Sequence, residues 1–387
     1  MTAKRRRLVP HRVALLLALL FVAPGLAACG VGRALEARAL LVEAAAGGPP
    51  AGSVLRREVG YRIEGRDGLG DLYRESERPP RAALVLVPGV TPQGRDDPRL
   101  VDFARLLARA RFAVLVPDLP NLRRLAVSAS DSQAIADAVE YLADAESTPG
   151  EGVGLVAISY AAGPAVIASL EPRLQDRLAF LFLIGGYHDL GAVIAAFTTG
   201  QVRAGEDGAW RPWRREPSIP WRFLAANAER VTEPRERVLL RAIAERRLAD
   251  PAAPIGDLAA RLGAEGAAVL ALVDNRDPDR VPALLAGLPD ALGGEIAALD
   301  LARRDLSGVT VPVLLMHGRN DPVIPWQQSR DLARALPSER VELVLLESFN
   351  HVERGQPNAA DEQRLHHLAQ RLIELREGII GSGGASP

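Results

Sequence analysis

Short, fully apolar runs recur along this chain, and longer segments with helical spacing separate them. The clearest runs are AALVLV (Ala82–Val87), FAVLV (Phe112–Val116), VGLVAI (Val153–Ile158) and AFLFLI (Ala179–Ile184). Runs of this length without polar residues are typical of strands buried on both faces of a parallel sheet. Their alternation with helical segments such as Pro98–Arg111 predicts an α/β fold with a doubly wound, mostly parallel sheet.

The same alternation resumes near the end of the chain after a long interruption. Val311–Met316 and Val341–Leu346 are predicted strands, and Ala359–Ile380 is a predicted final helix. Residues 190–305 contain short helical pieces divided by Pro and Gly and no strong strand. Because this segment is far longer than an ordinary loop, we predict a helical cap whose Leu and Ala side chains line an apolar cleft.

An opening hairpin is predicted before the first buried strand. The segments REVGYRIEG and LGDLYRE have the alternating pattern of half-buried strands, and we expect the chain to turn at residues 66–68, Arg-Asp-Gly.

The first residues have the composition of an export signal. MTAKRRRLVPHR is basic, VALLLALLFVAPG is apolar but short for a membrane-spanning helix, and small residues follow. The sequence LAAC at residues 26–29 resembles the lipobox of bacterial lipoprotein precursors, which implies cleavage before Cys29 and acylation of its thiol. A plain signal peptide or an uncleaved anchor is the alternative. Cys29 is the only cysteine, which excludes an internal disulfide.

These patterns together predict the organisation and location of the protein. We expect a lipid-anchored protein of the bacterial cell envelope, on the periplasmic or extracellular side of a membrane. The predicted parts are a signal peptide (1–28), a lipid-anchored tether that is helical at first (29–54), the first part of the core (55–189), the cap (190–305), the second part of the core (306–380) and a tail (381–387).

Three residue types that act together in acyl transfer each follow a predicted strand. Ser159 ends one strand, Asp321 follows another in HGRNDPVIP, and His351 follows a third in ESFNHVE. Open α/β sheets bind their ligands at these strand ends. In this order and strand context the three motifs resemble those of the α/β-hydrolase superfamily of serine esterases and lipases.

That resemblance implies a role for each residue. Ser159 is the expected nucleophile, His351 the general base, and Asp321 the acid that orients the histidine. The backbone N–H groups of Tyr160 and Val90 are the expected oxyanion hole.

Several positions have alternative interpretations. The superfamily pattern G-x-S-x-G is replaced by AISYA, with alanine at residues 157 and 161, and a serine after a strand also caps helices. Asp189 is a rival for the triad acid, and His317 is expected to be structural. Gly89 and His188 are candidates for the pocket lining.

The predicted function is hydrolysis of small or lipid-like carboxylic esters through an acyl-enzyme. Acyl transfer to another acceptor, amide cleavage, and a non-catalytic envelope protein that reuses the scaffold for binding are the alternatives. The formal net charge of −1 gives no electrostatic reason to expect nucleic acid. No close Cys and His spacing or nucleotide-binding loop occurs, so we expect neither metal nor cofactor.

Overall fold

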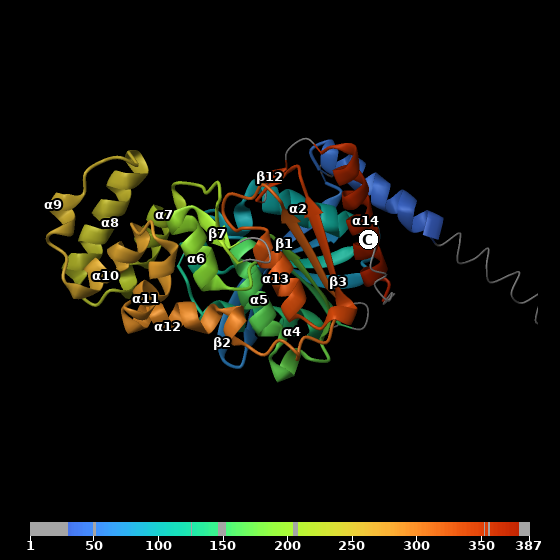
Figure 1. The fold of residues 1–387 in the computed structure, drawn as a ribbon. Helices are drawn as coiled ribbons and strands as arrows, with labels where there is room; N and C mark the ends of the chain where they lie inside the picture. The colour runs from blue at the N-terminus through green and yellow to red at the C-terminus, as the bar shows by residue number, and fades with distance from the viewer. Residues whose placement is uncertain are drawn as a thin grey trace, which may run out of the picture.

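An eight-stranded sheet runs through the middle of the molecule (Figure 1). The computed structural model describes residues 30–48, 52–124, 126–145, 152–203, 208–351, 353–354 and 357–378. The strand order is β1-β2-β4-β3-β5-β6-β9-β10, and all neighbours from β4 to β10 are parallel. The strands are β1 (Val54–Ile63), β2 (Arg66–Glu75), β3 (Ala82–Val87), β4 (Phe112–Pro117), β5 (Val153–Ile158), β6 (Leu178–Ile184), β9 (Val313–Gly318) and β10 (Val341–Leu346). The predicted doubly wound α/β fold is confirmed.

The apolar runs form strands because helices cover both faces of the sheet. In β3 every residue is buried, and successive side chains point to opposite faces. Ala83, Val85 and Val87 belong to one hydrophobic core, whereas Leu84 and Leu86 belong to the other. The sheet therefore separates two cores of different composition.

Different helices cover the two faces. One face, here named the cap face, carries α4 (Ser130–Asp144), α5 (Ala162–Ser169) and α13 (Gln327–Ala335). The opposite face, here named the terminal face, carries α2 (Pro98–Arg109) and α14 (Ala359–Arg376). A helix that includes residues 30–45, here named the N-terminal helix, packs on the terminal face beside α14 (Figure 1).

The opening hairpin turns two residues earlier than predicted. β1 and β2 are joined by Glu64 and Gly65, both with positive φ (47° and 80°), as tight hairpin turns require. The turn predicted at residues 66–68 is wrong, because these residues pair within β2. Gly68 lies opposite Tyr61, and a Cβ at Gly68 would lie 2.1 Å from the Tyr61 ring. This glycine therefore makes room for an aromatic ring and does not form the turn.

The segment between β6 and β9 is mainly helical. It contains one short hairpin of β7 (Gln201–Arg203) and β8 (Trp210–Pro212), which the sequence analysis did not predict. Its helices are α6 (Leu190–Thr199), α7 (Ile219–Asn227), α8 (Pro234–Ala249), α9 (Gly256–Ala259), α10 (Ala264–Val273), α11 (Val281–Ala286) and α12 (Asp290–Leu299). Figure 1 shows α8 to α12 at one end of the molecule, away from α14 and the N-terminal helix.

The predicted signal peptide and Cys29 lie outside the described residues. Within the described part of the chain, none of the helices combines the length and the apolar character needed to cross a membrane.

Candidate active site

Ser159 lies on a sharp turn between β5 and the helices that follow. β5 ends at Ile158, Ser159 opens a short 3-10 helix, and α5 begins at Ala162. Ser159 has a φ of +59°, a conformation that costs free energy for a residue with a side chain. Non-glycine residues held in this conformation cluster at functional sites. The backbone of Ser159 therefore has the strained geometry of a nucleophile elbow.

The two alanines of the AISYA sequence fit beside this turn. Ala157 and Ala161 are both fully buried, so their methyl groups are packed within the core. The glycine that the turn needs is Gly163, where a Cβ would lie 2.0 Å from Tyr187 Oη. Tyr187 Oη in turn donates a hydrogen bond to the Leu299 carbonyl of the cap (3.1 Å). The closest approach in the elbow region thus falls at Gly163, beyond the motif positions.

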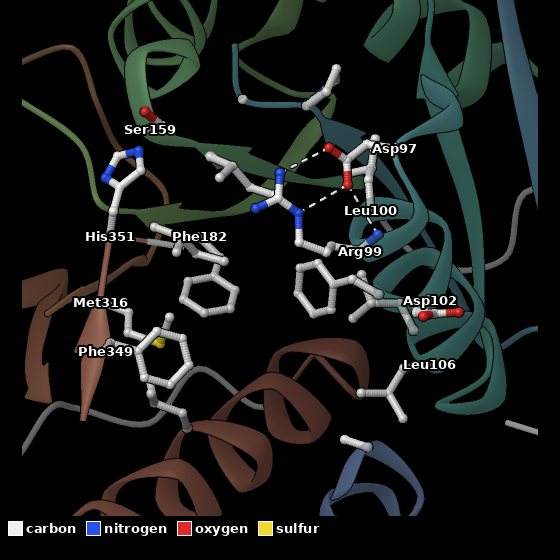
Figure 2. Close-up of a pocket in the computed structure, with 18 of the residues that line it drawn as sticks. Asp97, Arg99, Leu100, Asp102, Leu106, Ser159, Phe182, Met316, Phe349 and His351 are labelled. Atoms are coloured by element: carbon white, nitrogen blue, oxygen red, sulfur yellow. Dashed lines mark hydrogen bonds and ion pairs between the residues drawn. The ribbon is translucent and has the colours of Figure 1, made fainter. Parts of the chain in front are cut away.

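Asp321 and His351 come together from the loops after β9 and β10. His351 Nδ1 lies 2.7 Å from Asp321 Oδ2, so the imidazole donates its Nδ1–H to the carboxylate. His351 also has a positive φ of 59°. Figure 2 shows Ser159 beside the His351 imidazole at one end of a pocket. Residues distant in sequence are therefore gathered at one edge of the sheet.

The Asp321 carboxylate is buried and accepts hydrogen bonds from four groups. Oδ1 accepts from the backbone N–H of Val323 (2.7 Å) and Ile324 (3.0 Å), and Oδ2 contacts His351 and His317. Burial by itself raises the pKa of Asp321, but the nearby histidines and their hydrogen bonds outweigh this effect and hold the pKa below its usual range. The carboxylate is thus kept ionised next to His351.

His317 is the residue of this cluster that the sequence analysis assigned only a structural role. Its Nε2 lies 2.9 Å from the Ile324 carbonyl and 3.2 Å from Asp321 Oδ2. Since a carbonyl only accepts, Nε2 carries the proton, and Nδ1 accepts from the Ser329 hydroxyl (2.7 Å). His317 therefore fixes the loop that carries Asp321. The His-Gly pair four residues before Asp321 was the available signal.

The rival acid has a different task. Asp189 is the N-cap of α6, where its carboxylate accepts from the Ala192 backbone N–H (2.7 Å). The hydrogen bond to His351 comes from Asp321.

The expected oxyanion donors lie on both sides of Ser159. The N–H of Tyr160 belongs to the first turn of a 3-10 helix, where backbone donors lack intrahelical acceptors. Gly89 lies next to the serine, because a Cβ built on Gly89 would be 3.5 Å from Ser159 Cβ. Val90 follows in the same loop and lines the same pocket.

Comparison with known proteins identifies the fold. A family model described as serine aminopeptidase, S33, matches residues 289–353. A Legionella pneumophila protein provisionally named a hydrolase superimposes with a TM-score of 0.52 at 9% identity, over 84% of this chain and 89% of its own. This chain has the α/β-hydrolase fold.

Two further similarities cover less. RutD of Pseudomonas syringae, provisionally named a carbamate hydrolase, is 51% identical over 47 residues, which are 12% of this chain and 17% of that protein. The acylaminoacyl peptidase of Pyrococcus horikoshii gives a TM-score of 0.48 at 12% identity, over 87% of this chain and 43% of its own. This α/β-hydrolase chain therefore spans only a small part of the curated relative that it matches.

A cavity of about 950 Å³ opens from Ser159 and His351 into the terminal face of the α/β-hydrolase core. Its walls come from the loop that contains Gly89 and Val90, from the β6, β9 and β11 region, from α2 and α14, and from the N-terminal helix. The side chains nearest the sheet are Phe182, Met316 and Phe349 (Figure 2).

The expectation that the cap lines the apolar cleft is wrong for this cavity. Of the cap residues, those that line it comprise Glu216 alone. Cap side chains such as Leu239, Leu240 and Ile243 belong instead to the core of the cap face. His188 is likewise absent from the lining, and its backbone N–H donates to Gln328 Oε1 (3.1 Å).

A charged pair also borders the cavity. Asp97 caps α2 by accepting from the Arg99 backbone N–H, and its carboxylate accepts from the Arg99 guanidinium (2.9 Å). The hydrogen bond from the Arg99 side chain lowers the pKa of Asp97 to about 2, against the opposing effect of burial. Within the described residues, no group of three His, Cys, Asp or Glu side chains is arranged to hold a metal ion.

Proposed function

We propose that this protein is a serine hydrolase that cleaves carboxylic esters through an acyl-enzyme. The observation that carries the proposal is the strained Ser159 at the end of β5, beside a histidine whose Nδ1 lies 2.7 Å from a buried carboxylate. The α/β-hydrolase fold supports it, because this fold carries such triads at these strand ends.

Each group has a chemical task in the proposed reaction. His351 Nε2 takes the proton of the Ser159 hydroxyl as Oγ attacks the ester carbonyl carbon. The Asp321 carboxylate holds the imidazole in the correct tautomer and stabilises the imidazolium. The oxyanion accepts hydrogen bonds from the N–H groups of Tyr160 and Val90. Collapse of the intermediate passes the proton to the leaving alcohol, and a water molecule, activated in the same way, then releases the acid.

Labelling with a fluorophosphonate probe tests the proposal. The wild-type protein should label and should hydrolyse 4-nitrophenyl butyrate, and Ser159→Ala should do neither. A wild-type protein that stays unlabelled and cleaves no ester means that the scaffold serves binding only. Amide and carbamate analogues of the same acyl group should be included, because the matched family model is described as an aminopeptidase and RutD is named for carbamates.

We also propose that the protein is anchored to a membrane of the bacterial cell envelope through an acylated Cys29. The outer side of the N-terminal helix supports this idea: Val31, Leu35 and Val42 share one side of the helix and are 60 to 63% exposed. Arg38 lies on the same side, and an apolar surface with a basic residue suits a lipid surface. Cys29→Ser should move the protein from the membrane fraction to the soluble fraction, and an unchanged distribution would contradict the anchor.

A further inference from the structure

We propose that the cavity on the terminal face binds a long, unbranched acyl chain of the substrate, and that the N-terminal helix forms its far wall. This inference rests on the proposed function, because it extends the site at Ser159. It assigns substrate selection to the segment predicted as a tether and not to the cap.

The cavity is continuous from the reacting groups to the N-terminal helix. Ser159 and His351 line one end, and Leu40, Leu41 and Ala44 line the other. Between them, the sheet contributes Phe182, Met316 and Phe349, and α14 contributes Leu365 and Leu368. A volume of about 950 Å³ is at the upper end of the range for small-molecule sites, about 300 to 1,000 Å³, so it has room for a long chain.

The charged residues of the lining do not interrupt this path. Figure 2 shows Asp97, Arg99 and Asp102 on the α2 side, opposite Phe182, Met316 and Phe349. Asp97 and Arg99 form an ion pair with each other, so they need no partner from the substrate. An acyl chain can therefore pack along the sheet side without removing water from an unpaired charge.

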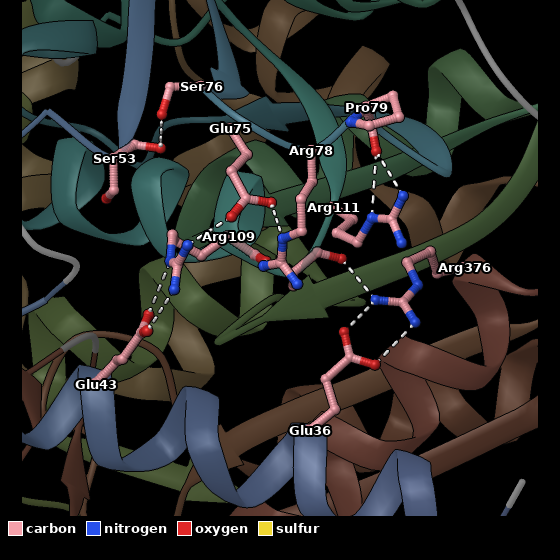
Figure 3. A network of polar contacts seen from close by, with 11 residues as sticks. Glu36, Glu43, Ser53, Glu75, Ser76, Arg78, Pro79, Arg109, Arg111 and Arg376 are labelled. Atoms are coloured by element: carbon pink, nitrogen blue, oxygen red, sulfur yellow. Dashed lines mark hydrogen bonds and ion pairs between the residues drawn. The ribbon is translucent and has the colours of Figure 1, made fainter.

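The N-terminal helix is held in place by ion pairs on both sides of its lining residues. Glu36 binds Arg376 through two hydrogen bonds (2.5 and 3.0 Å), and Glu43 binds Arg109 (3.0 Å), as Figure 3 shows. Ala37, on the same side of the helix, is fully buried. Leu40, Leu41 and Ala44 are consequently fixed toward the cavity, as a permanent wall requires.

This arrangement predicts a dependence on chain length. Each additional methylene that becomes buried improves binding by about fourfold, so kcat/KM should rise with acyl length until the chain meets the N-terminal helix. Short acyl groups should not sense the helix at all.

A bulky residue at the far wall tests the inference. Ala44→Trp should reduce kcat/KM for 4-nitrophenyl palmitate by about tenfold or more and leave the butyrate ester nearly unchanged, because it displaces several methylenes. Ala45→Trp is the matched control, since Ala45 is exposed and does not line the cavity. Ala369→Phe narrows the cavity from α14 and should act like Ala44→Trp.

Binding measured without turnover separates this inference from the proposed function. Ser159→Ala should bind the fluorescent fatty acid cis-parinaric acid, and palmitate should displace it. Adding Ala44→Trp to this variant should weaken binding by about tenfold. Binding without any wild-type ester hydrolysis overturns the proposed function and leaves the acyl cavity standing. No binding, or equal effects of Ala44→Trp on butyrate and palmitate hydrolysis, overturns the acyl cavity.

Discussion

The two faces of the central sheet differ in what their covering elements do. On the cap face, the long insertion packs its apolar side chains with α4 and α5 into one filled core. On the terminal face, α2, α14 and the N-terminal helix leave a cavity of about 950 Å³ that reaches Ser159. The comparison teaches that the longest insertion is not the element that shapes this cavity. The helices at the two ends of the chain shape it.

The largest effect should come from the group that lies where the two faces meet. Asp321→Asn should lower kcat by about 10⁴-fold, because the amide no longer selects the Nδ1–H tautomer of His351. The loss should be the same for short and long acyl groups, as measured by steady-state kinetics. Asp189→Asn is the control: Asp189 caps α6, so this variant should keep its kcat. A larger loss in Asp189→Asn would exchange the roles of the two carboxylates.

The terminal face should depend more on a single ion pair than the cap face does. The Arg376 side chain is fully buried, whereas that of Glu36 is 32% exposed. Glu36→Leu should therefore destabilise the fold by about 3 kcal/mol, because it removes the partner of a buried cation. Arg376→Leu should cost less, about 1 kcal/mol, since Glu36 can turn to water. Urea unfolding measures both changes.

The matched variant on the cap face is Glu295→Leu. Glu295 contacts Arg230 (3.0 Å), and Arg230 is partly exposed, so its charge remains solvated after the substitution. We expect a loss of about 1 kcal/mol. Equal losses for Glu36→Leu and Glu295→Leu would remove the distinction between the two faces.

A smaller, pH-dependent effect should appear where the cap meets α4. Asp131 is buried, and burial raises its pKa to about 6 despite a hydrogen bond from Asn121. Between about pH 4 and pH 6 the folded protein thus binds more protons than the unfolded chain, so this group lowers stability as pH rises. Asp131→Asn should gain about 2 to 3 kcal/mol relative to wild type between pH 4 and pH 7. Urea midpoints that differ by the same amount at both pH values would contradict this prediction.

The strands and the site motifs could be predicted because their signals are local. Fully apolar runs such as Ala82–Val87 have few alternatives to a buried strand, and the structure has β3 over the same residues. The turn between β1 and β2 was misplaced because Gly68 is a turn residue by type, yet it is required by the ring of Tyr61 across the hairpin. Local patterns do not contain such cross-strand contacts.

The chain order of Ser159, Asp321 and His351 identified the candidate site, since each follows a strand whose end lies at one edge of the sheet. The role of His317 was missed because it depends on where Ile324 and Ser329 fold back.

The sequence by itself determined the sheet, its two covered faces and the three residues gathered at its edge, because these follow from apolar runs and short-range motifs. Only the tertiary structure decided which helices enclose the cavity. The residues 30–48 have no local signal that places Leu40, Leu41 and Ala44 beside α14, and the Glu36–Arg376 pair joins positions at opposite ends of the chain. Contacts across such distances arise from packing and charge pairing in the folded state, which periodicity does not encode.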